Sequence, residues 1–404
     1  MEIGRQGMIG NDYTSRVWKG EEKKLKSRFL NTGSAFNLPL TSVASHTDLP
    51  FSPLACLREA ASAKAGERVG VRGIRNWNML LDPFKRKINY LRISVTDRCN
   101  LRCRYCMPEE GVPLISHADI LTYEEILRIV RVFAKEGISK VRLTGGEPLV
   151  RKGMVEFISS LSQIEQIKDL SLTTNGILLK EFAQALKKAG LKRVNISLDS
   201  LKKERFHQIT RRDGFERVWE GIEEALHVGL SPVKINMVAI RGMNDDEIES
   251  FAKLTFHFPL TVRFIEYMPA GNGEEWKESH LLPIPQIKAR LENLGKLITL
   301  SPDQWDGPAK RFRLEGSVGE IGLIGAVSSH FCSDCNRLRL TADGKIRTCL
   351  FSDEEMDLRE ILRKGGSDQD LKEQLIIALG KKPARHQIDT HFKKCQRNMS
   401  AIGG

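Results

Sequence analysis

Eight cysteines occur in this 404-residue chain, and six of them fall into two tight groups that are far apart in the sequence. The members of the two groups are Cys99, Cys103, Cys106, Cys332, Cys335 and Cys349. A disulfide scaffold is usually short and rich in cysteine throughout. Sparse thiols in clusters instead favour metal binding in a reducing compartment. The two remaining cysteines, Cys56 and Cys395, are interpreted as ordinary thiols.

The first cysteine group has the spacing C-x3-C-x2-C and comes directly after a predicted strand at residues 91–95. Zinc sites usually take four ligands in two separated pairs. A 4Fe–4S cluster can be held by three cysteines, which leaves one iron open to a chelating ligand. This spacing, with the aromatic Tyr105 before the last cysteine, resembles the radical S-adenosylmethionine (SAM) superfamily. In that superfamily the open iron binds the amino and carboxylate groups of SAM.

The second predicted strand covers residues 140–143, and a pair of glycines follows it. Gly145 and Gly146 lack side chains, so the backbone there can come close to a ligand. The next residue, Glu147, could accept hydrogen bonds from the ammonium group of SAM. Barrels built from alternating strands and helices carry their sites at this carboxyl end of the strands.

The second cysteine group has the spacing C-x2-C-x13-C and no clear fourth ligand. His330 with the three cysteines would make a closed zinc site, whereas the three cysteines alone would suit a second 4Fe–4S cluster with an open iron. Both interpretations stay open at this point. Arg337 and Arg339 are two residues apart, so on an extended segment they point to the same face. Two guanidinium groups beside a cluster are suited to binding phosphates.

The elements that position these groups alternate between strands and helices from about residue 88. Strands are expected at residues 91–95, 140–143, 170–173, 193–198, 233–240 and 262–266. Helices are expected at residues 122–136, 179–189, 215–227 and 245–254. This order predicts an α/β fold of parallel strands with helical crossovers. Six such units make a partial version of the eight-unit barrel.

The flanks of the predicted barrel divide the chain further. Residues 1–85 are rich in Ser, Ala, Arg and Lys and are expected to be a leader that directs the protein to the mitochondrial matrix; without such an address the expected location is the cytoplasm. Residues 86–282 form the expected radical SAM partial barrel. Residues 283–404 form a β-rich C-terminal region with the second cysteine group, in which residues 357–380 have a helical pattern.

Composition limits the classes of partner. The net charge of +12 suggests anionic partners. No compact block of Lys and Arg with interleaved aromatic residues occurs, so nucleic acid is not the expected partner. No run of 18 apolar residues occurs either, so no membrane span is expected.

Taken in order, several motifs resemble the GTP 3′,8-cyclase family, from about Phe84 to Gly404. They are residues 91–99, 142–148, 173–176, 195–200, 263–269, 331–340 and the terminal Gly403-Gly404. The resemblance implies a partial (β/α)6 barrel that the C-terminal region closes laterally. One departure is Phe84-Lys85-Arg86, where many members have Phe-Gly-Arg. The long leader fits a eukaryotic, organelle-directed form of the family.

The resemblance also implies a set of site residues. Those expected to contact SAM are Tyr105, Gly146, Glu147, Ser197 and Met268. Those expected to contact GTP are Arg92, Arg142, Thr173, Lys234, Arg337, Leu338 and Arg339. Those expected to act directly in catalysis are Arg337, Arg339, Gly403 and Gly404. The two glycines are included because the glycine tail of the family looks like a plug that enters the active site.

The reaction implied by the resemblance is the cyclisation of GTP to (8S)-3′,8-cyclo-7,8-dihydroguanosine 5′-triphosphate, the first step of molybdenum cofactor biosynthesis. It uses two 4Fe–4S clusters, SAM and an electron donor, and the next enzyme of the pathway makes cyclic pyranopterin monophosphate. A homodimer is also expected. Two alternatives remain: another radical SAM enzyme with an auxiliary cluster, and a zinc-stabilised nucleic-acid-binding protein. Colour separates them, since iron–sulfur protein is brown and zinc protein is colourless.

Overall fold

The computed structural model describes residues 80–270, 277–303, 307–386, 397 and 399–403, which belong to one compact unit. The expected leader lies almost wholly outside these residues. Gly404, Cys56 and Cys395 also lie outside them. In the part of the chain that the structure describes, no helix is both long and apolar enough to cross a membrane.

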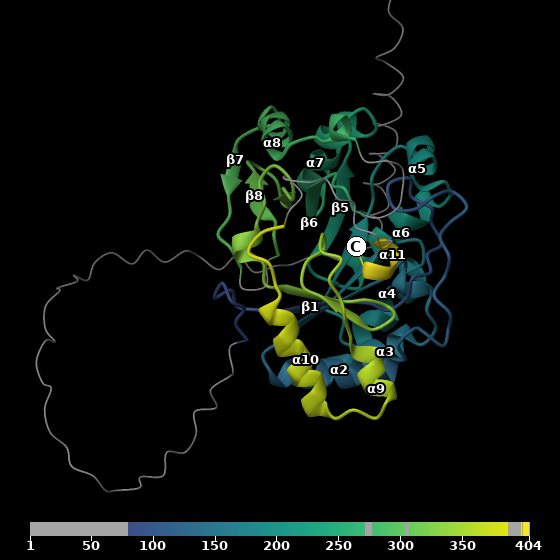
Figure 1. The fold of residues 1–404 in the computed structure, drawn as a ribbon. Helices are drawn as coiled ribbons and strands as arrows, with labels where there is room; N and C mark the ends of the chain where they lie inside the picture. Colours follow the sequence, from purple (N-terminus) through teal and green to yellow (C-terminus); the bar gives the residue numbers. More distant parts are fainter. Residues whose placement is uncertain (1–79, 271–276, 304–306, 387–396, 398, 404) are drawn as a thin grey trace, which may run out of the picture. The chain divides into compact units, whose positions relative to one another are not determined.

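Six parallel strands form the centre of the fold and pair in sequence order, as expected for repeated strand–helix units (Figure 1). Their bounds are β1 (Tyr90–Ser94), β2 (Lys140–Thr144), β3 (Asp169–Thr174), β4 (Arg193–Ser197), β5 (Val233–Ala239) and β6 (Leu260–Glu266). All residues of β1 and β2 are buried. Burial on both faces is usual for parallel strands, because helices cover the outer face. The predicted partial barrel is thus confirmed.

Helices connect the strands and cover the outer face of the sheet. They are α2 (Tyr123–Lys135), α3 (Met154–Ser162), α4 (Leu179–Lys188), α5 (Lys203–Thr210), α6 (Phe215–His227) and α7 (Ile248–His257). The start of α2 is fixed by a capping box, in which Thr122 accepts from the backbone of Glu125 and the Glu125 side chain accepts from the backbone of Thr122. The hydrophobic core lies between these helices and outward-facing strand residues such as Ile93 and Leu143.

The C-terminal region extends both edges of the six-stranded barrel. Here β9 (Glu320–Ile324) pairs in parallel with β6, and β10 (Arg337–Leu340) pairs in parallel with β1. The remaining strands are β7 (Leu297–Thr299), β8 (Lys310–Leu314), β11 (Lys345–Arg347) and β12 (Met356–Asp357). The sheet runs from β12 at one end to β7 at the other. The C-terminal region therefore completes the walls of the barrel without closing its ring of hydrogen bonds.

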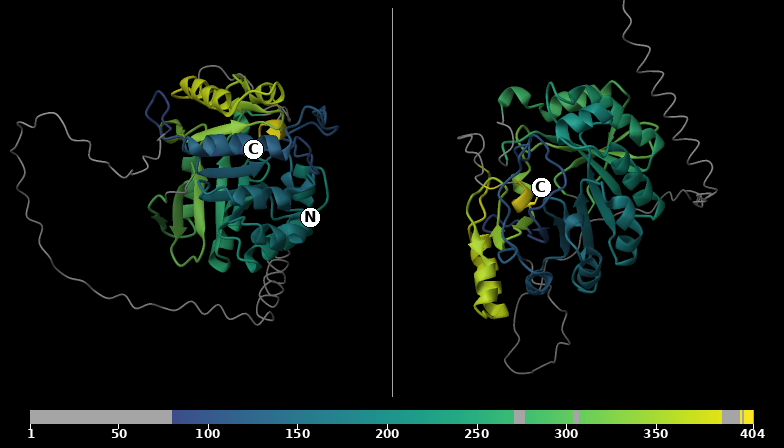
Figure 2. Two further views of the ribbon diagram at one scale, coloured as in Figure 1. Left: turned by 90° about the horizontal axis from the view of Figure 1, so that it is seen from below. Right: turned by 90° about the vertical axis from the view of Figure 1, so that its right-hand side faces the viewer.

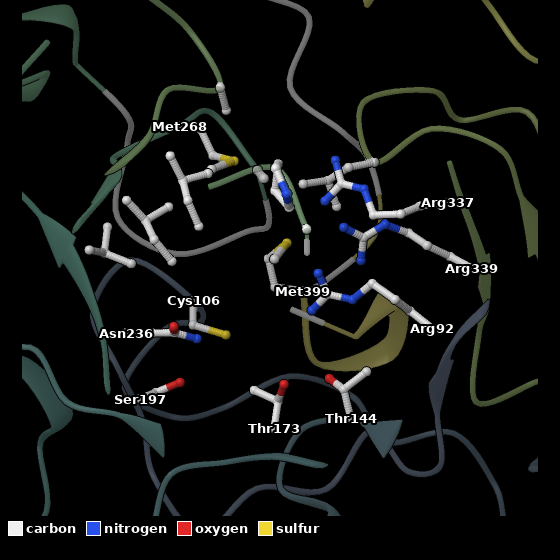
Figure 3. Close-up of a pocket in the computed structure, with 18 of the residues that line it drawn as sticks. Arg92, Cys106, Thr144, Thr173, Ser197, Asn236, Met268, Arg337, Arg339 and Met399 are labelled. Atoms are coloured by element: carbon white, nitrogen blue, oxygen red, sulfur yellow. The ribbon is translucent and has the colours of Figure 1, made fainter. Parts of the chain in front are cut away.

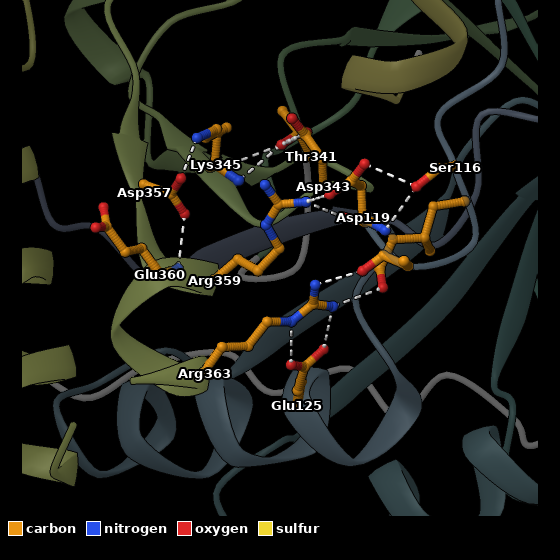
Figure 4. A network of polar contacts seen from close by, with 12 residues as sticks. Ser116, Asp119, Glu125, Thr341, Asp343, Lys345, Asp357, Arg359, Glu360 and Arg363 are labelled. Carbon is orange, nitrogen blue, oxygen red and sulfur yellow. Dashed lines mark hydrogen bonds and ion pairs between the residues drawn. The ribbon is translucent and has the colours of Figure 1, made fainter. Parts of the chain in front are cut away.

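The α-helices in the described part of the C-terminal region are α8 (Ile284–Glu292), α9 (Leu358–Arg363), α10 (Asp368–Gly380) and α11 (Met399–Ile402). The helical pattern expected at residues 357–380 is interrupted, because Gly365 has a φ of +77° and Ser367 caps the start of α10. Both α9 and α10 pack on α2 (Figure 2). The ion pair between Arg363 and Glu125 (3.0 Å) joins α9 to α2 (Figure 4). Exposed ion pairs contribute about 0–1 kcal/mol, so buried residues such as Leu371 supply most of the attachment.

Inward-facing residues of neighbouring strands lie side by side because the strands pair in register. Arg92 of β1 pairs with Arg339 of β10 on one side and with Arg142 of β2 on the other. On the next pair of strands in the sheet, Thr173 of β3 pairs with Asn195 of β4. Side chains on one face of a strand alternate with those on the other. The apolar neighbours of these polar residues therefore face the helices, and the polar residues face the inside of the barrel.

Candidate active site

A cavity of about 330 Å³ lies inside the barrel, at the carboxyl ends of the strands. Both predicted cysteine groups line it, so the structure brings together six thiols from distant parts of the chain. Other predicted site residues that line the cavity are Arg92, Tyr105, Arg142, Gly146, Thr173, Ser197, Met268, Arg337 and Arg339. Their arrangement puts three arginines on one side and Met268, Cys106 and Ser197 on the other (Figure 3).

The first cysteine group lies on the loop after β1. The backbone N–H of Cys106 donates to the carbonyl of Cys103 (2.9 Å), and the amide of Asn175 lies 3.9 Å from the sulfur of Cys99. Burial raises the pKa of Cys99 to about 11 and that of Cys106 to about 12. Burial and the nearby Cys106 raise the pKa of Cys103. Thiols so placed become thiolates when a metal replaces their protons. Burial alone thus favours the neutral thiols in this loop, and only binding to a metal would displace their protons.

The glycine pair after β2 allows two loops to approach each other closely. A Cβ on Gly146 would lie 2.3 Å from the carbonyl oxygen of Arg98, and one on Gly145 would lie 2.6 Å from that of Thr96. The backbone N–H of Gly146 donates to the Thr96 carbonyl (2.7 Å). These contacts hold the start of the cysteine loop against the end of β2. The glycines thus serve this packing, and Gly146 also lines the cavity.

The position of Glu147 differs from the one expected for a SAM contact. Its carboxylate is fully buried and does not line the cavity. It accepts hydrogen bonds from the backbone of Leu149 (3.0 Å), the hydroxyl of Thr174 (2.8 Å) and the backbone of Asn175 (2.7 Å). Burial raises its pKa to about 7, even though these donors lower it. The side chain fixes the end of β3, and we find it outside the cavity lining.

Tyr105 is held in place by residues at the ends of neighbouring strands. Its hydroxyl donates to Asp199 (2.6 Å), and the backbone N–H of Val238 donates to the other oxygen of that carboxylate (2.8 Å). Burial raises the pKa of Asp199 to about 6, although Tyr105 and Val238 lower it. The ring of Tyr267 packs edge-on against Tyr105, with ring centres 6.5 Å apart. The ends of β4, β5 and β6 thus orient Tyr105 next to Cys106.

The second cysteine group is surrounded by cations. Lys382 donates to the sulfur of Cys335 (3.5 Å), and Arg86 donates to the carbonyl of Cys332 (2.7 Å). Burial opposes ionisation of Cys335, but the charges of Arg337 and Lys382 outweigh it and lower its pKa to about 6. The thiolate form is thus favoured here. Such an environment suits a ligand that must bind metal as a thiolate.

The zinc alternative would need His330 as the fourth ligand beside the second cysteine group. Among the described residues, no three Cys, His, Asp or Glu side chains are close enough together to bind a single metal ion. His330 lines the same cavity as the second cysteine group. The three thiols of each cysteine group line that cavity together with His330.

Arg263 of β6 lines the cavity, and so do four arginines from β1, β2 and β10. These four are Arg92, Arg142, Arg337 and Arg339. Burial lowers the pKa of Arg339 to about 10, with the charge of Arg337 adding to the effect, and burial and Arg339 lower that of Arg92. The guanidinium of Arg337 stacks over the ring of Phe331 at 4.7 Å. Like charges held together in a buried place repel one another, so an anion bound here relieves the strain.

Two predicted GTP residues lie outside the cavity lining. Leu338 is fully buried in the hydrophobic core and pairs with Leu91, so its side chain faces the helices and not the cavity. Lys234 of β5 is buried between strand neighbours Asn195 and Thr261 and is not part of the lining. Thr173, in contrast, lines the cavity with a buried hydroxyl that has no hydrogen-bond partner among the described residues.

The C-terminal tail reaches the cavity through α11. Met399 and Ser400 line it, and Gly403 follows with a φ of +83°. Arg339 donates a hydrogen bond to the carbonyl of Gly403. A Cβ on Gly403 would lie 2.8 Å from Cγ2 of Thr144, so only glycine fits without displacement. The expected entry of the tail into the site agrees with this position, as far as the described residues extend.

Sequence reasoning missed several residues of the site. They are Arg86, Tyr90, Asp199, Asn236, Lys382 and His386. Tyr90, Asp199, Asn236 and His386 line the cavity, whereas Arg86 and Lys382 support it from behind. Asp199 follows β4, so its position at the carboxyl edge of the sheet was a usable signal. Asn236 lies in the middle of β5. Nothing local in the sequence marks Lys382 or His386, because only tertiary packing brings their segment to the cavity.

Comparison of the sequence with known families and proteins identifies the family of this chain. The chain matches the model of the radical SAM superfamily over residues 93–255 and that of the Molybdenum Cofactor Synthesis C family over residues 260–388. It is 52% identical over 325 residues to the GTP 3′,8-cyclase of Thermodesulfovibrio yellowstonii, which covers 80% of this chain and 99% of that protein. The chain belongs to the GTP 3′,8-cyclase family.

Other comparisons agree with membership of the GTP 3′,8-cyclase family. The protein of that name from Moorella thermoacetica is 52% identical over 323 residues, with 80% of this chain and 99% of the relative covered. Both relatives are bacterial and give no support to the expected eukaryotic form. Streptococcus suis SuiB bound to S-adenosylmethionine is similar in fold, with a TM-score of 0.51 and 14% identity over 74% of this chain and 66% of that chain.

Proposed function

We propose that this chain cyclises GTP to (8S)-3′,8-cyclo-7,8-dihydroguanosine 5′-triphosphate in molybdenum cofactor biosynthesis. One observation supports this assignment above the others: a single cavity joins the loop of the first cysteine group, a cluster of buried arginines and the second cysteine group. The enzyme is a radical SAM lyase, as the two family matches and the relatives at about half identity indicate. Its substrate is GTP.

The cofactors are SAM and two 4Fe–4S clusters. Cys99, Cys103 and Cys106 would hold one cluster, and Cys332, Cys335 and Cys349 would hold the other. When bound and reduced, the first cluster with SAM supplies a 5′-deoxyadenosyl radical, which is chemistry that belongs to the cofactor. The task of the protein is to bind, orient and enclose the reactants.

On the SAM side, we assign the wall of the cofactor site to Tyr105, Gly146, Ser197 and Met268. All four line the cavity, and Ser197 and Met268 lie on the same side of it as Cys106 (Figure 3). Tyr105 is fixed through Asp199, and Gly146 through its bond to the cysteine loop. Rigid support of this kind places the two reactants within reach of each other, which is worth many powers of ten in rate.

On the GTP side, we assign the triphosphate to Arg92, Arg142, Arg337 and Arg339. Arginine binds phosphate with a planar fork of donors, and the four positive charges match the negative charge of the substrate. Thr173 adds a buried hydroxyl with no partner among the described residues. We assign no direct side-chain contact to Leu338 or Lys234, because neither lines the cavity.

The glycine tail is proposed to close the site around the substrate. Gly403 lies against Thr144 and Ser94, whose atoms leave no room for a side chain. Its carbonyl accepts from Arg339 and so orients a guanidinium that we assign to catalysis. Gly404 is assigned the same role by its place beside Gly403, although it lies outside the described residues. A backbone plug without side chains would keep water away from the reacting atoms.

We further propose three partners and a location. An electron donor must reduce the first cluster, the next enzyme of the pathway must take up the product, and two copies of the chain would form a dimer. Delivery to the mitochondrial matrix by residues 1–85 rests on the composition of that segment alone. A reporter fused to residues 1–85 tests the location, and light scattering of the purified protein tests the dimer.

The experiment for the proposed function is turnover under anaerobic conditions. Protein with reconstituted clusters is incubated with dithionite, SAM and GTP, and the products are analysed by mass spectrometry. We expect 5′-deoxyadenosine and a cyclised guanosine triphosphate, with the cyclised product lost in Cys332→Ala. If 5′-deoxyadenosine forms while GTP stays intact, the radical SAM assignment holds and the substrate assignment is wrong. A colourless protein that binds zinc would contradict both.

A further inference from the structure

His386 lies in the wall of the cavity beside the second cysteine group, and none of the functions described above uses it. Only 9% of the residue is exposed. Its Nε2 atom lies 2.9 Å from the carbonyl oxygen of Ala326. Its Nδ1 atom is buried and has no hydrogen-bond partner among the residues that the structure describes. A buried polar atom without a partner is unfavourable, so a ligand in the cavity is expected to complete it.

The contact with Ala326 decides which ring nitrogen of His386 can accept a hydrogen bond from a ligand. A carbonyl oxygen only accepts hydrogen bonds, so Nε2 must carry the hydrogen in this contact. In a neutral imidazole the other nitrogen, Nδ1, is then an acceptor. Because His386 lines the cavity, its ring brings this acceptor to the cavity wall, where it suits a ligand that offers an N–H group.

The position of this acceptor is fixed on both sides of the ring. On one side, Glu266 at the end of β6 accepts from the backbone of Val327 (2.8 Å) and Ser328 (2.9 Å), which holds the loop that carries Ala326. On the other side, Arg86 donates to the carbonyls of Pro383 (2.7 Å) and Ala384 (3.1 Å), just before His386.

Lys382 strengthens the second of these attachments. It donates to the carbonyls of Arg337 (3.0 Å) on β10 and of Thr348 (2.7 Å), which directly precedes Cys349. These bonds tie the segment before His386 to both places. Lys382 is itself buried. His386 thus belongs to a rigid support, which is what a specificity-determining contact requires.

The surroundings of His386 suit a planar base. The rings of His330 and Phe351 pack edge-on against it, with ring centres 5.6 Å and 5.2 Å away. Phe331 also lines the cavity, and the guanidinium of Arg337 stacks over its ring. If the arginines bind the triphosphate of GTP, the purine is the part of the substrate that can pack against the rings of His330, Phe331 and Phe351.

We propose that Nδ1 of His386 accepts a hydrogen bond from the 2-amino group of guanine and so selects GTP over other purine nucleoside triphosphates. The proposal rests on the proposed function, because it takes GTP as the substrate. The 2-amino group is the donor that guanine has and hypoxanthine lacks, and it projects from the edge of the base. A site built to bond such a group rejects the analogue that lacks it, since its own polar atom is then left without a partner.

The test compares GTP with ITP, which differs from GTP only in lacking the 2-amino group. Affinities are measured by calorimetry on the cluster-containing protein, for the native chain, for His386→Phe and for His330→Phe. In the native chain we expect GTP to bind about tenfold or more tightly than ITP. His386→Phe should remove that preference by weakening GTP alone. His330→Phe is the matched control, because it changes a neighbouring ring of the same wall and should leave the GTP-to-ITP ratio unchanged.

The outcomes separate this proposal from the proposed function. An equal loss of GTP and ITP affinity in His386→Phe, or an unchanged ratio, overturns the role of His386 while GTP cyclisation by the native chain still stands. Failure of the native chain to bind GTP contradicts the proposed function, and the present proposal with it. Iron content and visible absorption of the variant show whether the clusters are intact. His386→Asn, which keeps an acceptor near the Nδ1 position, should restore part of the preference.

Discussion

Arg339 of β10 donates a hydrogen bond to the carbonyl oxygen of Gly403, 64 residues further along the chain. The same arginine pairs with Arg92 in the register of β10 and β1. The contact therefore connects the C-terminal tail to the row of cations that we assign to the triphosphate. A tail that is fixed in this way can both enclose the substrate and orient the group that binds it.

Replacing Gly403 by alanine should lower turnover at least tenfold. The residue has a φ of +83°, and an added Cβ would lie 2.8 Å from a methyl group of Thr144. The left-handed backbone alone disfavours alanine by about 1 kcal/mol, so the tail is expected to leave its place. The measurement is the rate of GTP cyclisation at fixed cluster content. Gly316→Ala is the control, because Gly316 has a φ of +79° but open space around its Cβ position. Equal rates for both variants would contradict the role of the tail.

Replacing Arg92 by alanine should weaken GTP binding about 10- to 100-fold, since a hydrogen bond to a charged group is worth about 1.5–3 kcal/mol. The affinity of GTP can be measured by calorimetry without turnover. The control is Arg313→Ala on β8, which removes the same charge from a half-exposed side chain outside the cavity lining. If both variants lose the same affinity, general charge and not the cavity binds the triphosphate.

Replacing Lys85 by glycine should stabilise the protein by about 1 kcal/mol. Lys85 has a φ of +61°, a left-handed conformation that disfavours residues with a Cβ by roughly 1–2 kcal/mol. It stands where many relatives in the resemblance have glycine, and its neighbour Arg86 supports the second cysteine group. The midpoint of urea unfolding checks this. Lys85→Ala, which keeps the Cβ, should give no such gain, and a gain of the same size there would rule out the backbone explanation.

The stability of the protein should depend on pH through Glu147. Burial raises the pKa of this carboxyl to about 7 from 4.5, so the folded state favours the protonated form. Its contribution to the free energy of unfolding is full below the pKa of the unfolded chain and is lost as pH rises through the folded pKa, by on the order of 3 kcal/mol.

Glu147→Gln removes this ionisation, so the loss of stability between about pH 5 and about pH 8 should become smaller. The measurement is the free energy of unfolding from urea titrations at several pH values. Glu165→Gln, on an exposed residue, serves as the control and should keep the native dependence. An unchanged dependence in Glu147→Gln would show that other groups produce it.

Much of the barrel could be predicted because its signals are local. Apolar runs of strand length alternate with amphipathic helices, and a capping box marks the start of α2. The predicted helix at residues 215–227 coincides with α6. The C-terminal region was harder, since the pairing of β10 with β1 and of β9 with β6 joins segments that are far apart in the chain. No local pattern specifies such contacts.

The site shows the same division. The cysteines, Tyr105 and the arginines could be found because each belongs to a short motif with fixed spacing. Glu147 and Leu338 belong to such motifs too, yet a motif does not say which way a side chain points. The strand register buries Leu338 in the core, and backbone donors at the end of β3 take up the carboxylate of Glu147. His386 has no motif signal at all.

The most direct test of the central claim follows a hydrogen atom from substrate to product. Formation of the 3′,8 bond requires removal of the hydrogen at C3′ of the ribose. Native protein with intact clusters is therefore incubated with SAM, a reductant and GTP that carries deuterium at C3′. If the cavity positions the ribose next to SAM as we propose, mass spectrometry should find the deuterium in 5′-deoxyadenosine, in step with formation of the cyclised nucleotide. Formation of 5′-deoxyadenosine without deuterium, while labelled GTP remains unchanged, would contradict the account.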